Sequence, residues 1–115
     1  MTPSPDNYQD LLLREETEEG FKTWVIDRAR TSGWTVVHFR PGRTEHGWAT
    51  PVEADGKGYP DLTLFREKTI WAELKREGRY LDRDQKLWRE RIRTAGGEWH
   101  LWRPRDRDLI TELLR

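Results

Sequence analysis

Apolar residues recur with helical spacing in the first third of the chain. The positions that follow the i, i+3, i+4 pattern of a buried stripe are Phe21, Trp24, Val25 and Ala29. They predict a helix over about residues 15–31, with Thr17 as its N-cap and acids after it at the positive end of the helix dipole. Gly33 is a natural stop for this helix. A start near Asn7 is the alternative, because leucines at 11–13 would then join the helix.

Two more amphipathic stretches predict helices in the C-terminal half. The first covers residues 82–95 and ends at a pair of glycines, and its stripe consists of Leu87, Trp88, Arg91, Ile92 and Ala95. The second follows Pro104, with Asp106 or Asp108 as its cap. The residues of this last helix that we expect to face inward are Leu109, Ile110, Leu113 and Leu114.

Shorter apolar runs that are rich in β-branched and aromatic residues predict strands. They lie at 34–40, 62–65, 71–74 and 98–102. The charged tetrapeptide 66–69 joins the two middle runs, which predicts a β-hairpin. The predicted order is therefore α-β-β-β-α-β-α, and we expect an α/β fold with a mixed sheet flanked by helices.

A long segment, residues 41–60, separates the first predicted strand from the hairpin and shows no periodicity. Arg40, Arg43 and Lys57 lie in or beside it. Loops of this length are uncommon in a small domain and tend to be functional or disordered. The three cations are candidate phosphate contacts, because such contacts position a nucleic acid without reading its sequence.

Composition narrows the class of protein. With 115 residues, 34% of them hydrophobic, the chain suits one domain with a small core, to which seven Trp contribute. We expect residues 1–14 to form a frayed leader and residues 15–115 a single domain. The absence of cysteine excludes a disulfide framework and a thiolate zinc site. No apolar run approaches the roughly 18 residues of a membrane span, so we expect no membrane partner and a cytoplasmic location.

Charge is balanced overall but unevenly distributed. The chain has 21 basic and 21 acidic residues, yet residues 1–20 hold six acids and one base. The remainder therefore carries a surplus of bases. Such a body is compatible with a polyanionic partner, although a surplus of this size is also ordinary for a solvated surface.

Candidate chemistry lies on the predicted hairpin. Glu73 and Lys75 are two positions apart on one strand, so they share a face. A two-residue loop would pair position 61 with 74 and point Asp61 to the other face, whereas a three-residue loop at 66–68 would pair 61 with 73. We predict the odd loop or a bulge. Two carboxylates and an ammonium on one face suit a divalent cation that holds a phosphate and a water.

Each of these residues also has an ordinary structural explanation. Asp61 is a typical turn residue, and Glu73 with Lys75 could be an exposed charged pair. Asp82 and Gln85 have the spacing of a capping box, so Gln85 serves as a cap, as an active-site residue, or as both.

Pro60-Asp61 followed by Glu73-Leu74-Lys75 resembles the PD-(D/E)xK nuclease motif. More narrowly, the chain resembles a stand-alone VRR-NUC domain of the Holliday-junction-resolvase-like type, found in phages and bacteria. The short motif has low specificity, and the ordered set over residues 15–115 is far more specific. Its further matching positions are Glu18, Phe21, Gly33, Trp34, His38, Gly58, Leu62, Gln85, Trp88, Gly96, Trp102, Arg103, Pro104 and Asp106.

The resemblance implies a restriction-endonuclease-like fold that binds Mg²⁺ or Mn²⁺. Asp61 and Glu73 would be metal ligands, with the main-chain carbonyl of Leu74 beside them. Glu18 would reach the site from the first helix, as a ligand directly or through water. Helical spacing favours Glu18 over Glu19, which is displaced around the helix away from the buried face.

The remaining catalytic roles implied by the resemblance belong to Lys75 and Gln85. Lys75 would orient or activate the attacking water and stabilise charge that builds on the phosphorus. Gln85 would approach Lys75 or the water from the start of the second helix of the family fold.

The leading hypothesis is a Mg²⁺-dependent endonuclease that hydrolyses DNA and is selective for structure, such as Holliday junctions or other branched or double-stranded DNA. Cutting two strands would require a symmetric homodimer, which the sequence leaves open. The alternative is a non-catalytic DNA-binding module with a nuclease fold inside a larger complex. Two carboxylates facing phosphate argue against it, because they repel the phosphate unless a cation intervenes. A nuclease acting on RNA is a third hypothesis.

Overall fold

The computed structural model describes residues 5–39, 42–44, 47–49 and 54–115. In chain order the elements are α1 (Pro5–Glu15), α2 (Glu18–Thr31), β1 (Thr35–His38), β2 (Gly42–Thr44), β3 (Gly47–Ala49), β4 (Leu62–Phe65), β5 (Thr69–Leu74), α3 (Arg83–Thr94), β6 (Glu98–Trp102), a 3-10 turn (Pro104–Asp106) and α4 (Arg107–Leu114). The predicted α/β class is confirmed. The pattern did not predict α1 as a separate helix or the small antiparallel pair of β2 and β3.

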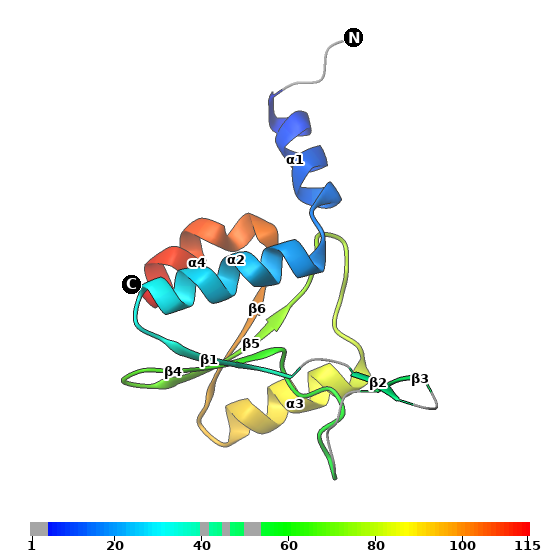
Figure 1. Cartoon of the computed structure of the whole chain (residues 1–115), viewed down its shortest axis with the longest axis vertical. Helices are drawn as coiled ribbons and strands as arrows, with labels where there is room; N and C mark the ends of the chain where they lie inside the picture. The colour runs from blue at the N-terminus through cyan, green and yellow to red at the C-terminus, as the bar shows by residue number, and fades with distance from the viewer. Residues whose placement is uncertain (1–4, 40–41, 45–46, 50–53) are drawn as a thin grey trace.

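A four-stranded mixed sheet forms the centre of the molecule, in the order β1-β4-β5-β6. Strand β4 pairs antiparallel with β1 and β5, and β5 pairs parallel with β6 after the chain crosses over through α3. Helices α2 and α4 lie side by side on one face of the sheet, while α3 lies on the other (Figure 1).

The core lies between the sheet and the layer formed by α2 and α4. The predicted stripe of α2 is confirmed, since Phe21, Val25 and Ala29 are fully buried. They pack with Ile110 and Leu114 of α4 and with the core side of the sheet. Burying one large apolar side chain stabilises a fold by about 1.5–3 kcal/mol, so this layer fixes α2 firmly against the strands.

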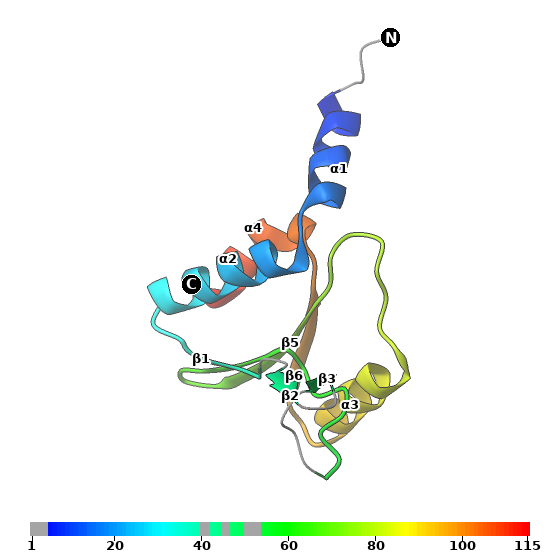
Figure 2. The ribbon, with the colours of Figure 1, turned by 45° about the vertical axis from the view of Figure 1, so that its right-hand side comes forward.

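The N-terminal helical region is divided at residues 16–17. The Thr17 hydroxyl accepts a hydrogen bond from the Gly20 N–H at 3.0 Å, which confirms Thr17 as the N-cap of α2. Helix α1 projects away from the body of the molecule (Figure 2). Its Tyr8, Leu11 and Leu12 side chains are exposed. None of the helices in the described ranges is long and apolar enough to cross a membrane.

Two leucines lie where the helical pattern did not predict them. Leu109 was expected to face inward but is 61% exposed, and Leu87 of the α3 stripe is 41% exposed. Helix α4 buries Ile110 and Leu114, four residues apart, which turns position 109 toward solvent. Helix α3 buries Ile92, and its rotation leaves Leu87 at the edge of the buried stripe, where it meets solvent.

The loop of the β4–β5 hairpin is tied to the ends of two helices by Arg66. Its guanidinium donates hydrogen bonds to the carbonyls of Ser32 (2.8 Å), Leu114 (3.1 Å) and Arg115 (3.1 Å). It also lies over the Trp34 ring, 4.4 Å from the ring centroid. The exposed end of the hairpin is thereby held against the C-terminal ends of α2 and α4, and its opposite end carries the candidate site.

Candidate active site

The register of the hairpin places Asp61 opposite Glu73. Phe65 pairs with Thr69 and Leu62 pairs with Ala72, so the loop contains three residues, 66–68. The next position along the ladder sets residue 61 against residue 73. The predicted odd loop is confirmed, and with it the placement of both carboxyl side chains on one face of the sheet.

Asp61 is held at the end of β5 by the backbone. Its Oδ2 atom accepts a hydrogen bond from the Leu74 N–H at 2.8 Å. The preceding segment packs tightly on α3, because a Cβ added to Gly58 would lie 2.5 Å from the carbonyl carbon of Asp84. Gly58 also has a φ of +84°, which glycine adopts without strain. The hydrogen bond from Leu74 therefore fixes the side chain of Asp61, and the packing of Gly58 on α3 fixes the backbone that precedes it.

Glu73 is a buried acid, with 2% of its surface exposed. Burial raises the pKa of Glu73 well above its usual range, and a hydrogen bond with the Asp61 carboxyl and the charge of Asp61 raise it further. The Lys75 ammonium acts on this pKa in the opposite direction. Burial and the contact with Asp61 therefore favour the protonated form of Glu73 when no cation is present.

Gln85 caps α3, as one of its two predicted roles requires, and its side chain also contacts Glu73. It completes the capping box of α3, with the Asp82 side chain accepting from the Gln85 N–H and the Gln85 Oε1 accepting from the Asp82 N–H, each at 2.9 Å. Its Nε2 donates to Glu73 Oε1 at 3.3 Å. Because the cap fixes the amide oxygen, the amide nitrogen is directed at the acid.

Lys75 and Glu18 approach the carboxyl pair from different elements. The Lys75 N–H donates to the Trp102 carbonyl at 3.0 Å, which extends the pairing of β5 with β6 by one residue. Burial raises the pKa of Glu18, and the charge of Asp61 raises it further, whereas the charge of Lys75 lowers it. Glu18 is therefore close enough to sense both residues.

Neighbouring acids of Glu18 have other partners. Glu19 forms an ion pair with Lys22 at 2.7 Å on the surface of α2. Glu16 forms an ion pair with Arg107 of α4. The preference for Glu18 as the acid that faces Asp61 agrees with these contacts.

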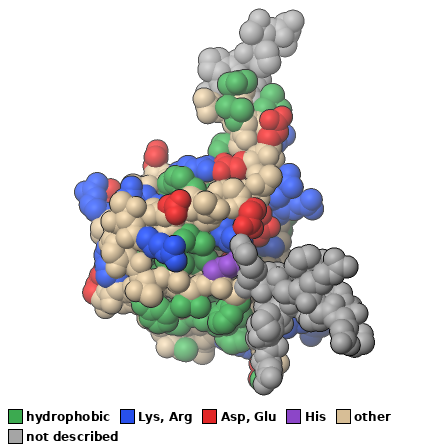
Figure 3. Space-filling model, viewed as in Figure 1, with side chains coloured by type: hydrophobic (Ala, Val, Ile, Leu, Met, Phe, Trp, Pro, Cys, Tyr) green, Lys and Arg blue, Asp and Glu red, His purple; other side chains and the backbone are tan. Residues whose placement is uncertain are grey.

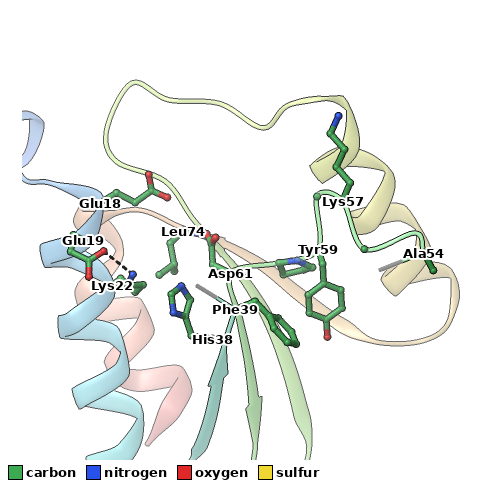
Figure 4. Close-up of a pocket in the computed structure, with 13 residues that line it drawn as sticks. Glu18, Glu19, Lys22, His38, Phe39, Ala54, Lys57, Tyr59, Asp61 and Leu74 are labelled. Carbon is green, nitrogen blue, oxygen red and sulfur yellow. Dashed lines mark hydrogen bonds and ion pairs between the residues drawn. The ribbon is translucent and has the colours of Figure 1, made fainter. Parts of the chain in front are cut away.

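A pocket of about 720 Å³ opens beside Asp61. Figure 4 shows Glu18 and Lys22 from α2, His38 from β1, and Asp61 grouped at one end of it. Phe39 and Tyr59 line it further along. Acidic and basic side chains are mixed over α2 on this face, with hydrophobic side chains gathered lower down (Figure 3).

The pattern of the sequence did not single out Lys22 or Tyr59 as site residues. Lys22 lies one helical turn after Glu18, and Tyr59 lies two positions before Asp61. Both spacings are signals that could have been read, although each is also common in ordinary surfaces.

The predicted phosphate contacts are only partly described. Lys57 is 89% exposed, lies 3.6 Å from Asp84, and points away from Asp61 at the far end of the pocket (Figure 4). Arg40 lies outside the described residues. Arg43 belongs to β2, but its side chain is also outside them. All three contacts stay predictions.

The donor set fits a hard divalent cation. Among the described residues, no three His, Cys, Asp or Glu side chains form a group that could hold one ion. The candidate donors are instead Asp61 and Glu73, followed by the Leu74 carbonyl, and Glu18 lies close enough to Asp61 to sense its charge. Mg²⁺ keeps several waters and needs only one or two protein carboxylates. Asp61 and Glu73 would hold such a cation, with Glu73 binding it in its deprotonated form.

No protein-family model and no curated protein sequence matches this chain. What bears on function is therefore the carboxyl pair, the lysine beside it and the pocket onto which they open.

Proposed function

We propose that this chain is a divalent-metal-dependent endonuclease with a restriction-endonuclease-like fold that hydrolyses phosphodiester bonds of DNA. The observation that carries the proposal is the contact between the Asp61 and Glu73 carboxyls, with the charge of Lys75 acting on Glu73. The same three residues carry the resemblance to the PD-(D/E)xK motif. The described order of α2, the sheet strands, α3, β6 and α4 is compatible with that fold.

Asp61 and Glu73 would hold Mg²⁺ or Mn²⁺, with the Leu74 carbonyl beside them. The ion, when bound, polarises a phosphoryl oxygen and makes a bound water more acidic. The protein contributes a preformed pair of carboxyls, because the Leu74 N–H fixes Asp61 and the Gln85 amide contacts Glu73. Preformed ligands spare the site the cost of ordering them during the reaction.

The chain's other polar groups would act on the substrate and on water. The Lys75 ammonium places positive charge where negative charge develops on the phosphate in the transition state. Glu18, which lies close enough to Asp61 to sense its charge, would accept a hydrogen bond from the attacking water. Gln85 would act by positioning Glu73, since its amide contacts that acid directly.

The form of DNA follows from the resemblance, which suggests double-stranded or branched substrates such as Holliday junctions. Symmetric cleavage of two strands would need two copies of the site, and hence a homodimer. A non-catalytic DNA-binding module is the competing function. The buried pair of acids opposes it, because a protein that only binds phosphate gains nothing from placing two carboxyls beside it.

The test is cleavage of labelled junction, flap, duplex and single-stranded DNA, and of RNA, with Mg²⁺, Mn²⁺ or EDTA. We expect cleavage of DNA with metal and none in EDTA. Lys75→Ala and Asp61→Asn should each slow it by at least about a hundredfold, the usual effect of removing a group that stabilises developing charge. Lys86→Ala, an exposed lysine of α3, is the matched control and should cleave normally.

Two results would contradict the proposal. One is an absence of cleavage on every DNA with either metal, and if DNA still binds, the competing module is favoured. The other is cleavage that Lys75→Ala leaves intact.

A further inference from the structure

A strap of eight residues, 75–82, connects β5 to α3, and both of its ends meet the candidate active site. It begins at Lys75, directly after the strand that carries Glu73. It ends at the cap of α3, where Gln85 returns to contact Glu73. The strap arches away from the sheet between these points (Figure 1). A strand bound along the strap would therefore meet the carboxyl pair where the strap begins or ends.

The strap is anchored by the segment that follows β6. The Glu77 carboxylate, 7% exposed, accepts hydrogen bonds from the Arg105 N–H (3.1 Å) and from its Nε (2.9 Å). The Arg79 carbonyl accepts a hydrogen bond from Arg103 Nη2 at 2.8 Å. These contacts fix the strap at Glu77 and Arg79, so the residue that follows Arg79 extends from an anchored backbone.

Tyr80 is the residue that the strap presents. It is 79% exposed, the highest value among the large hydrophobic side chains of the described residues. The Arg103 guanidinium lies over its ring at 5.7 Å from the centroid. One face of the ring therefore has a cation on it, and most of the remaining ring surface meets solvent.

Bases outnumber acids in the sequence around Tyr80. Residues 75–83 contain four bases and two acids. Of the acids, Glu77 is engaged by Arg105 and Asp82 accepts from the Gln85 N–H in the cap of α3. Arg79 and Arg83, on either side of Tyr80, are exposed. An aromatic face flanked by cations suits a partner that carries both a flat ring and a phosphate.

We propose that Tyr80 is a stacking platform for an unpaired base of the DNA strand next to the scissile phosphate, with Arg79 and Arg83 contacting that strand's phosphates. The proposal rests on the proposed function and narrows its substrate to DNA with unpaired nucleotides beside the cut, such as forks, flaps or overhangs. Bases within an intact duplex are stacked on one another and offer no free face to a tyrosine. Stacking on aromatic side chains with cations along the backbone is the usual way in which proteins hold single strands.

The test compares binding of two DNAs by fluorescence anisotropy in EDTA, where no turnover occurs. One is a blunt duplex, and the other is a fork of the same sequence with unpaired arms. Tyr80→Ala should weaken binding of the fork about tenfold, the loss typical of one stacked base, and leave the blunt duplex unchanged. Tyr80→Phe should bind like the wild type. Tyr8→Ala is the matched control, because Tyr8 is also exposed but lies on α1.

Abasic residues in the fork arms give a readout that does not depend on the variant's folding. They should weaken binding by the wild type as much as Tyr80→Ala does, and should cause no further loss in that variant. Equal binding of the fork by wild type and Tyr80→Ala, or an equal loss on fork and duplex, would overturn the proposal. A protein partner on Tyr80 would give the first of these results. Because the assay needs no cleavage, a wild type that binds but does not hydrolyse DNA refutes the proposed function alone.

Discussion

Burial of Glu73 lowers the stability of the fold, but it places an acid where a functional site would need one. An acid with 2% of its surface exposed, in contact with another acid, is costly in a small protein. An amide or an apolar side chain would fill the same position at lower cost. Strongly perturbed acids of this kind cluster at functional sites, which is why the pair bears on function more than any other contact in the fold.

Glu73→Gln should therefore remove cleavage and stabilise the metal-free protein above neutral pH. The folded pKa of Glu73 lies above its unfolded value of 4.5, so the folded state binds this proton more tightly. Stability of the wild type is retained below the unfolded pKa and falls as pH rises toward the folded one, by up to about 1.4 kcal/mol per pH unit. Glutamine does not titrate and lacks this slope. Urea titrations in EDTA at about pH 5 and about pH 8 measure the difference. Parallel pH profiles for the two proteins would refute the prediction.

The two roles of Gln85 can be separated by its capping partner. Asp82→Ala and Gln85→Ala should each destabilise the protein by about 0.5–2 kcal/mol, because each breaks the capping box. Only Gln85→Ala removes the hydrogen bond to Glu73, so only it should also slow cleavage. Thermal melts and cleavage rates of both variants are the measurement. If Asp82→Ala slows cleavage equally, Gln85 acts only as a cap.

At the scale of elements, the features that could be predicted are those that depend on residues close together in the sequence. The stripe of α2, the cap at Thr17 and the capping box of α3 are patterns within one helix, and all were confirmed. The hairpin register followed from face matching, since an odd loop or a bulge is needed to put Asp61 and Glu73 on one face, and the structure has the odd loop. The exposure of Leu109 was not predictable, because it depends on how α4 is rotated against the sheet.

The same limit applies to the candidate site: residues close together in the sequence could be predicted to meet, and residues that meet only through packing could not. Asp61, Glu73 and Lys75 lie on one hairpin, and Gln85 lies in the cap of the next helix. The placement of Lys22 in the pocket with Asp61 depends instead on where α2 packs along the end of the sheet. Spacing within a segment carries no information on that packing.

The segment before Asp61 packs against α3 at Gly58. A second glycine with positive φ, Gly96, has no such contact and serves as a matched control. Gly58→Ala introduces a Cβ 2.5 Å from backbone of Asp84, whereas Gly96→Ala has no atom within 4 Å. Both glycines have positive φ, so both variants incur the conformational cost of about 1–2 kcal/mol. Gly58→Ala should be less stable by a further ~1–3 kcal/mol, from overpacking. Equal urea midpoints would show that this contact is loose.

At the scale of the whole molecule, the core and the site belong to the part of the chain that begins with α2. Helix α1 projects from this body, and the side chains described for it are not buried. Its links to the rest are surface contacts, such as the Asp10 ion pair with Arg105 at 3.5 Å. The residues that line the pocket lie outside α1, and its contact with the strap is a hydrogen bond from Arg76 Nη2 to the Arg14 carbonyl at 3.4 Å.

Deletion of residues 1–15 should therefore lower the melting temperature by no more than about 4–8 °C, the effect of roughly 1 kcal/mol in a domain of this size. Cleavage should persist. Deletion of residues 107–115 is the contrasting control, since it removes Ile110, Leu114 and two carbonyls that bind Arg66, and it should abolish folding. Circular dichroism melts and cleavage assays report both. Loss of folding on removing residues 1–15 would assign α1 a role in the core.

The central claim is that Asp61 and Glu73 together hold a divalent cation, and the most direct measurement is anomalous diffraction from crystals soaked in Mn²⁺. We expect an anomalous peak in contact with both carboxylates, absent from crystals of Asp61→Asn soaked in the same way. Crystals that show no manganese at this pair, at a concentration that supports cleavage in solution, would contradict it.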